Sequence, residues 1–190
     1  MDVTIDIPEP VVIDGENWAY ISFEVPKTDV ALDIFDALSL ERQDMLIEAI
    51  AKSAYLQSGE RRRPVSEVLD QLPMQAALRM RDGALQAIMN DAEPERTPAG
   101  TYIVKLAYQV KLNEEKRITA IEFKQPTFGL MRDALRINDM RERFYAVIRL
   151  TGTAMIEGGD PEPMVDAYTR ALSAPDVGTI ISTVIADFFG

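Results

Sequence analysis

The stretch from Ile118 to Leu150, ITAIEFKQPTFGLMRDALRINDMRERFYAVIRL, most constrains the fold, because it predicts a strand, a stop and a helix in immediate succession. Apolar and polar residues alternate up to Phe123, as in a half-buried strand, and Pro126 ends the ladder because it has no N–H to donate. Thr127 is the predicted N-cap of the next helix, since its hydroxyl can accept from an amide of the first turn. We therefore expect strand and helix to meet at this proline.

The same pattern stands one hundred residues earlier in the chain. Eight residues are identical at this spacing over seventy positions. The pairs are Ile21/Ile121, Phe23/Phe123, Pro26/Pro126, Asp33/Asp133, Ala54/Ala154, Gly59/Gly159, Val65/Val165 and Leu72/Leu172. The spacing of apolar residues in the last helical segment of each half also corresponds. The sequence therefore predicts two copies of one module; the alternative is two unrelated segments that share amphipathic spacing.

The length of 190 residues accommodates two small domains, each with a modest core. We expect a flexible arm over 1–10, a first repeat over 11–90, a linker over 91–100 and a second repeat over 101–190. The linker, DAEPERTPAG, is rich in proline and charge. The predicted fold class is α+β, mostly helical, with two similar units that each consist of a β-hairpin followed by about four helices.

Each predicted unit opens with a hairpin. Asp14-Gly15 is a strong turn signal that joins Val11–Ile13 to Trp18–Val25, and the second hairpin joins Tyr102–Leu112 to Arg117–Phe123. The predicted helices are 28–38, 39–56, 65–72 and 76–90 in the first unit and 127–136, 138–156, 163–172 and 176–189 in the second. The segment from Ser173 to Asp176 predicts a capped helix start.

The chain contains neither cysteine nor histidine. Disulfides, thiolate metal sites and the Ser-His-Asp triad are thereby excluded, and we expect no enzyme and no cofactor. Asp29, Asp33 and Asp36 stand at helical spacing. They lack the glycine-bearing loop of a calcium site, so no metal is expected.

The net charge of −11 is concentrated in the first hundred residues, which carry 19 acidic and 9 basic side chains. Binding to phosphate backbones needs concentrated Lys and Arg, so no nucleic-acid partner is expected. The only basic run, Arg61-Arg62-Arg63, has two interpretations: a solvated loop, or a binding site for an acidic tail or a phosphate.

No run approaches the roughly 18 apolar residues of a membrane span. The acidic N-terminus does not resemble a secretory signal, so a cytoplasmic location is predicted.

Two aromatic or apolar features are candidate interfaces. Trp18 and Tyr20 of the first hairpin are either interface anchors or core residues. The apolar C-terminal helix, ending in Asp187-Phe188-Phe189-Gly190, either occupies a partner's groove or belongs to the intramolecular core.

The sequence ITAIEFKQPTFGLMRDAL, followed by a helix ending in IRLTG and a final helix ending in ADFFG, resembles the tail assembly chaperones of Mu-like and related tailed phages and prophages. The resemblance covers roughly residues 102–190. In this chain Lys124-Gln125 replaces the arginine pair of the family, and Leu130 replaces its usual aspartate.

The resemblance implies a chaperone of the host cytoplasm that binds the tape measure protein, with tail tube protein as a further candidate client, and has no catalytic residues. A turn and the hairpin aromatics are then the expected partner-binding residues. These are Trp18, Tyr20, Pro26, Pro126, Thr127 and Phe128. Two alternatives stay open, namely a structural tail or baseplate component of the virion, and an acidic inhibitor that imitates nucleic acid. Self-association into a homo-oligomer also stays open.

Overall fold

The computed structural model describes residues 2–89 and 93–189, and the chain divides into two compact units. Unit 1 comprises Met1–Pro26 and Val30–Met89, and unit 2 comprises Lys27–Asp29 and Asn90–Gly190. Each unit is an antiparallel sheet with helices packed on it, and the two are described one after the other.

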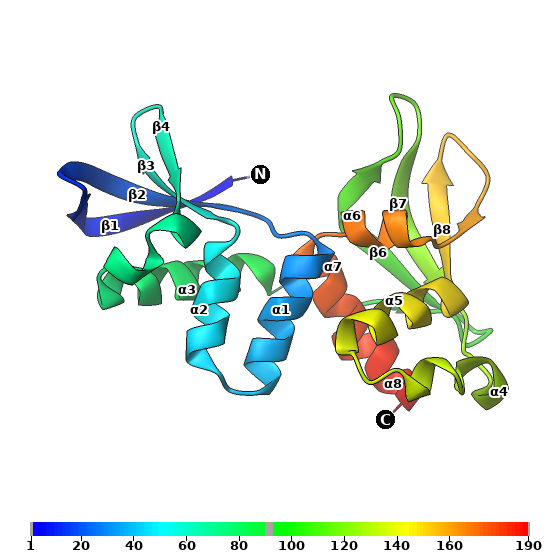
Figure 1. The fold of residues 1–190 in the computed structure, drawn as a ribbon. Helices are drawn as coiled ribbons and strands as arrows, with labels where there is room; N and C mark the ends of the chain where they lie inside the picture. Colours follow the sequence, from blue (N-terminus) through cyan, green and yellow to red (C-terminus); the bar gives the residue numbers. More distant parts are fainter. Residues whose placement is uncertain (1, 90–92, 190) are drawn as a thin grey trace. The chain divides into compact units, whose positions relative to one another are not determined.

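Unit 1 contains a sheet of four strands in the order β1-β2-β3-β4 (Figure 1). The elements are β1 (Asp2–Ile13), β2 (Glu16–Glu24), α1 (Thr28–Ser39), α2 (Gln43–Ala51), β3 (Ala54–Ser58), β4 (Arg61–Pro64), the 3₁₀ turns η1 (Val65–Glu67) and η2 (Leu69–Gln71), and α3 (Met74–Ile88). Helix α3 packs on β1 and α2 packs on β3. Ile21, Phe23 and Leu56 are fully buried and form the sheet's contribution to the core.

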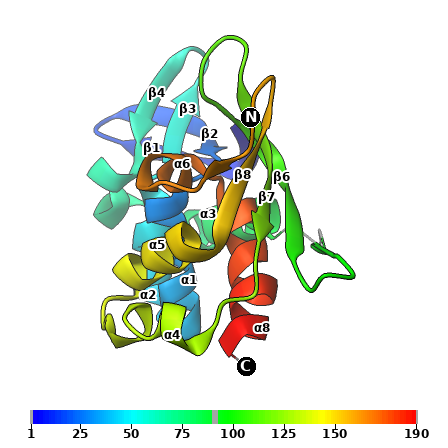
Figure 2. The ribbon, with the colours of Figure 1, turned by 90° about the vertical axis from the view of Figure 1, so that its right-hand side faces the viewer.

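Unit 2 contains a sheet of five strands in the order β5-β6-β7-β8-β9. The elements are β5 (Glu95–Arg96), β6 (Tyr102–Lys111), β7 (Arg117–Phe123), α4 (Phe128–Met131), the 3₁₀ turn η3 (Ala134–Arg136), α5 (Met140–Thr151), β8 (Gly152–Glu157), β9 (Glu162–Pro163), α6 (Asp166–Ala171), α7 (Ala174–Thr179), the π-helical turn η4 (Ile180–Ile185) and α8 (Ala186–Phe189). Helix α7 packs on β6 and α5 on β8, on one side of the sheet (Figure 2).

Several local predictions are confirmed. Asp14 and Gly15 both have positive φ, 52° and 78°, as the predicted two-residue hairpin turn requires. The Thr127 side chain accepts a hydrogen bond from the Leu130 amide and caps α4. Ser173 is the N-cap of α7, although its hydroxyl donates to the Asp176 carboxylate and not to a backbone group. Local turn and cap chemistry is therefore readable from the sequence.

The predicted fold class is wrong, because each unit holds a larger sheet and less helix than a hairpin followed by about four helices. The last residues of the predicted long helices 39–56 and 138–156 instead belong to the strands β3 and β8. In β8 the alternate residues Gly152, Ala154 and Ile156 are buried and lie against the partner strand β7. This period of two suits a strand, and pairing with β7 outweighs the helical pattern upstream.

Two predicted boundaries also differ. Residues 2–10, expected to be a flexible arm, belong to β1, where Val3 and Ile5 pair with β2. The terminal atom of Ile5 lies 2.5 Å from where a Cβ on Gly83 of α3 would stand, so a larger residue there would require the Ile5 side chain to move. In the predicted linker, residues 91 and 92 lie outside the described residues, and Glu95–Arg96 forms β5 against β6.

The two units share an order of elements: a hairpin, two helical segments, a second hairpin and a final helical region. The register of the first hairpin breaks at corresponding places, between Asp6 and Val11 of β1 and between Lys105 and Val110 of β6. The ungapped spacing of one hundred does not persist, because Phe23 pairs with Ala54 whereas Phe123 pairs with Gly152. The helical connection of unit 2 is therefore two residues shorter.

Asp176 joins α7 to the irregular part of β6. It is buried; its carboxylate accepts from the Ala107 amide at 2.6 Å and from the Ser173 hydroxyl. Ala107 lies inside the register break, where its N–H has no partner on β7. Burial raises the pKa of Asp176, although hydrogen bonds from Ser173 and Ala107 oppose that rise. The side chain thus satisfies a backbone group that the sheet leaves unpaired.

Asp176→Ala is expected to destabilise the protein by about 1–3 kcal/mol, because it leaves the Ala107 amide unsatisfied. Asp176→Asn keeps an acceptor and should cost less. The raised pKa means that the folded state holds the proton more tightly, so wild-type stability should fall relative to Asp176→Asn as pH rises from about 4 through the folded pKa. Urea unfolding over a pH series measures both effects, and an alanine variant as stable as the asparagine variant would contradict this role.

Lys27–Asp29 pack with unit 2 although they precede it by sixty residues in the sequence. Lys27 forms an isolated antiparallel bridge with Ser173. Thr28 is completely buried, and its hydroxyl hydrogen-bonds to the carbonyl oxygens of Thr169 and Leu172. Unit 2 is therefore incomplete without these three residues.

Thr28→Val is expected to destabilise unit 2 by about 1–3 kcal/mol, because the isosteric side chain leaves two buried carbonyl groups without this donor. Thr28→Ser retains the hydroxyl and serves as the control. Hydrogen exchange of α6 in the whole chain reports the change. Equal protection of α6 in both variants would show that the buried hydroxyl contributes nothing.

Candidate partner-binding surface

Among the described residues of unit 2, four of the six exposed large apolar side chains lie close together in sequence around α4, and the other two are Leu150 and Val165. Phe128, Leu130, Leu135 and Met140 are 76%, 47%, 40% and 38% exposed. They lie within thirteen residues of one another, on α4, η3 and the first residue of α5. We call these four residues the α4 surface. Exposed apolar side chains of this kind on a folded unit are a candidate binding site for an apolar partner.

Buried residues of α4 and η3 pack against α5 and fix the position of the α4 surface. Met131 and Ala134 are buried and pack in one cluster with Ala146 and Val147 of α5. Pro126 precedes the helix, and Thr127 caps it. The inner residues thus anchor a short helical turn, which projects its outer residues into solvent at fixed positions. A fixed apolar surface loses little conformational entropy on binding.

The predicted partner-binding residues divide between the two units. In unit 2, Pro126 is half-buried, Thr127 is exposed and Phe128 is the most exposed large apolar residue among those described. In unit 1, Trp18 is only 3% exposed, and Pro26 is buried. Tyr20 is 42% exposed, so the first hairpin presents one aromatic side chain and not two.

Trp18 is a core residue whose indole N–H has no hydrogen-bond partner among the described residues. The Arg61 guanidinium lies 5.7 Å from its ring centroid. Of the two roles expected for Trp18, interface anchor or core residue, its burial supports the core residue.

Leu130, Leu135 and Met140 belong to the α4 surface but are not among the partner-binding residues that the sequence predicts. Each lies in a segment with helical spacing of apolar residues, which predicts burial. Helix α4 is too short to bury a whole stripe, so part of its apolar content stays outside. The sequence pattern predicts a helix over 127–136 and does not show that α4 has only four residues.

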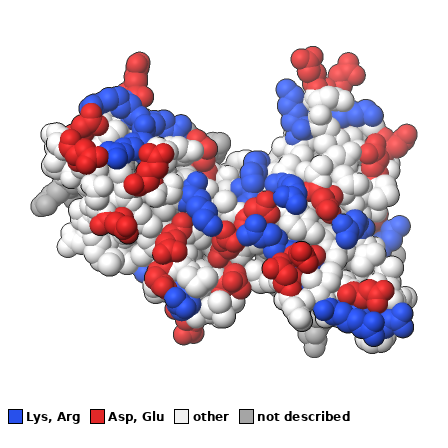
Figure 3. Space-filling model, in the orientation of Figure 1, with Lys and Arg blue, Asp and Glu red and all other residues white. Residues whose placement is uncertain are grey.

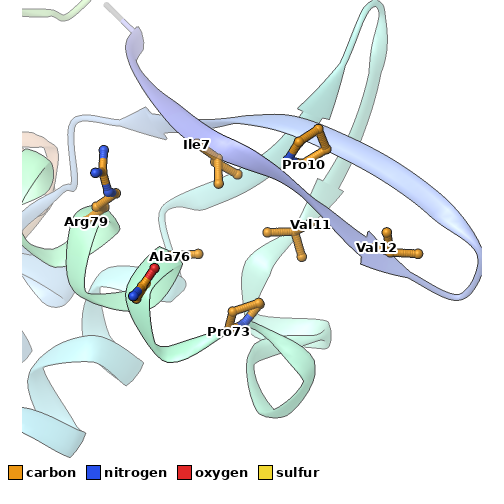
Figure 4. A pocket seen from close by; sticks show the side chains of 8 residues that line it. Ile7, Pro10, Val11, Val12, Pro73, Ala76 and Arg79 are labelled. Atoms are coloured by element: carbon orange, nitrogen blue, oxygen red, sulfur yellow. The ribbon is translucent and has the colours of Figure 1, made fainter.

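A second apolar feature is an open groove in unit 1 between β1 and the start of α3 (Figure 4). The groove has a volume of about 290 Å³, and its lining residues are Ile7, Pro10, Val11, Val12, Pro73, Gln75, Ala76 and Arg79. Val12 and Met74 are exposed apolar residues on these same two elements. The groove lacks an exposed aromatic side chain among its lining residues, so we regard the α4 surface as the stronger candidate.

The basic run Arg61-Arg62-Arg63 forms strand β4, and its interpretation as a solvated loop is wrong. The three arginines form ion pairs with Glu16, Glu24 and Asp14 at 3.0, 3.1 and 2.8 Å. Arg62 also lies over the Tyr55 ring, 4.3 Å from its centroid. These side chains are therefore engaged with carboxylates of the first hairpin.

Asp29 is the centre of a polar cluster in unit 2. The Tyr145 hydroxyl donates to it at 2.9 Å, and Arg141 and Arg170 lie 3.5 and 3.3 Å from its carboxylate. Burial, followed by the hydrogen bond to Asp29, raises the pKa of Tyr145. A raised pKa keeps the phenol protonated, which is unfavourable for a nucleophile or general base. The cluster stabilises the attachment of Lys27–Asp29.

The acidic residues at helical spacing do not come together as a metal site. Asp29 is engaged as above, and Asp33 accepts from Lys52 at 2.7 Å. Over residues 2–89 and 93–189, no group of three or more carboxylates stands close enough to hold a metal ion.

The apolar stripe of the C-terminal helical region belongs to the intramolecular core, because Val177, Ile180 and Val184 are buried.

Comparisons with protein-family models, curated proteins and solved structures found no match to this chain. In the part of the chain that the structure describes, no helix combines the length and apolarity needed to cross a bilayer.

Proposed function

We propose that this protein is a tail assembly chaperone that binds the tape measure protein during phage tail morphogenesis, in the host cytoplasm. The observation that supports the proposal is the α4 surface, where Phe128 and its apolar neighbours stand exposed on an anchored helical turn. A long helical client aggregates through its apolar stripe until it is covered, and a fixed apolar surface covers such a stripe reversibly. The resemblance of residues 102–190 to that family supports the same assignment.

The test is co-expression of this chain with the tape measure protein of the same genome. The proposal expects the tape measure protein to be insoluble alone and to co-purify with this chain when both are present. Mass spectrometry of finished particles should then find the tape measure protein without this chain. A tape measure protein that is equally soluble alone and never co-purifies would overturn the proposal.

Presence of this chain in finished particles would favour the structural tail or baseplate alternative. The third candidate, an acidic imitator of nucleic acid, needs unpaired carboxylates arranged along a surface. On the first hairpin, Asp14, Glu16 and Glu24 are instead paired with the arginines of β4. That pairing weakens the case for imitation, so the chaperone is the function that we favour.

A further inference from the structure

The α4 surface has a basic rim in an otherwise acidic protein. The segment 124–136 carries Lys124, Arg132 and Arg136 against the single acid Asp133, whereas the whole chain has a net charge of −11. Figure 3 shows basic side chains gathered in a band over the α4 end of unit 2, with acidic side chains beside it. The local sign of charge is thus the reverse of that of the whole molecule.

The arginines of this rim are weakly engaged within the protein. Arg132 and Arg136 both approach the same Asp133 oxygen, at 3.8 and 3.7 Å, and that aspartate is 80% exposed. One carboxylate cannot neutralise two guanidinium groups, and exposed pairs at such distances hold little free energy. On β4, by contrast, each arginine has its own carboxylate at 3.1 Å or less.

From this juxtaposition we propose that the α4 surface selects a client helix whose apolar stripe is flanked by Asp or Glu. The inference rests on the proposed function and names the chemistry of the client. Arg132 directly follows α4 and Arg136 ends η3, so an amphipathic helix that covers the α4 surface brings its flanking residues near both cations. Acidic flanks gain from these cations, and basic flanks are repelled.

Two other anionic partners fit the surface less well. A nucleic-acid backbone offers phosphates to the rim but nothing to cover a phenylalanine that is three-quarters exposed. An anionic membrane would repel a chain of net charge −11, and a helix of four residues is too short to lie in a bilayer interface. A protein helix uses both the apolar centre and the basic rim.

The test uses two labelled synthetic peptides of about five helical turns with the same leucine face, one flanked by Glu and one by Lys. Fluorescence anisotropy with the whole chain should give about tenfold tighter binding of the Glu-flanked peptide at low salt, a preference that shrinks at about 0.5 M salt. The double variant Arg132→Glu, Arg136→Glu should lose or invert the preference. The matched control Lys105→Glu, Lys111→Glu makes the same change in net charge at other exposed positions and should keep it.

The outcomes separate the charge inference from the chaperone proposal. Equal binding of both peptides, with co-purification of the tape measure protein intact, would overturn the charge inference alone. Binding of neither peptide, or saturable binding to vesicles rich in anionic lipid in preference to the peptides, would also overturn it. Loss of the preference in the control variant would show that net charge, and not the rim, sets the selectivity.

Discussion

The double variant Phe128→Ser, Leu130→Ser is expected to bind its helical client about 10–100-fold more weakly than the wild type, without unfolding. Apolar anchors at the centre of an interface each contribute about 1–2 kcal/mol or more, and about 1.4 kcal/mol corresponds to tenfold in affinity. Both side chains are largely outside the core, so their replacement should change the free energy of unfolding by only about 0.5 kcal/mol. Anisotropy titration with the Glu-flanked peptide, paired with thermal unfolding, measures both.

Leu40→Ser is the matched control for this variant. Leu40 is 56% exposed, similar to Leu130, but belongs to unit 1, just after α1. The control should bind the client as the wild type does. If the control lost affinity equally, exposed apolar residues would be acting without regard to position, and the α4 surface would have no special role.

Gly152→Ala is expected to destabilise unit 2 by about 1–3 kcal/mol, the usual cost of overpacking. A Cβ at this position would lie 2.8 Å from the Ile148 carbonyl oxygen, 2.9 Å from Met164 Cγ and 3.3 Å from a ring carbon of Phe123. The first neighbour is backbone at the end of α5, so it cannot rotate aside. Gly152 marks the point where α5 turns directly into β8.

Gly129→Ala is the control for that substitution, because a Cβ there meets no atom closer than 4.0 Å, the Thr127 hydroxyl. Alanine in place of an exposed helical glycine should be neutral or slightly stabilising. Urea denaturation of both variants gives the comparison. A Gly152→Ala protein as stable as the wild type would mean that α5 and β8 shift freely relative to Phe123.

Much of the local structure was predictable, because turns and caps depend on neighbouring residues. Asp14-Gly15 specifies its turn through backbone conformation, and Thr127 specifies the start of α4 through one hydroxyl. The strands β3 and β8 were not predicted, because each is short and directly follows a helix whose apolar spacing continues into it. Their strand character comes from pairing with β2 and β7, a long-range contact that no local pattern contains.

The candidate site was predictable only in part. Phe128 was expected near a partner from the resemblance of its segment to the tail assembly chaperones, and the structure places it in solvent. Trp18 was expected as an equal candidate, yet it lies in the core opposite Val11, a pairing that depends on the β1 register. The two units share an order of strands and helices, and the predicted duplication stays a prediction.

Hydrogen exchange of the whole chain, alone and with the co-purified tape measure protein, tests the central claim most directly. The account predicts that binding slows exchange over residues 128–140, while β3 and β4 of unit 1 exchange as in the free protein. Protection confined to the groove between β1 and α3, or unchanged exchange over 128–140 in a stable complex, would contradict it.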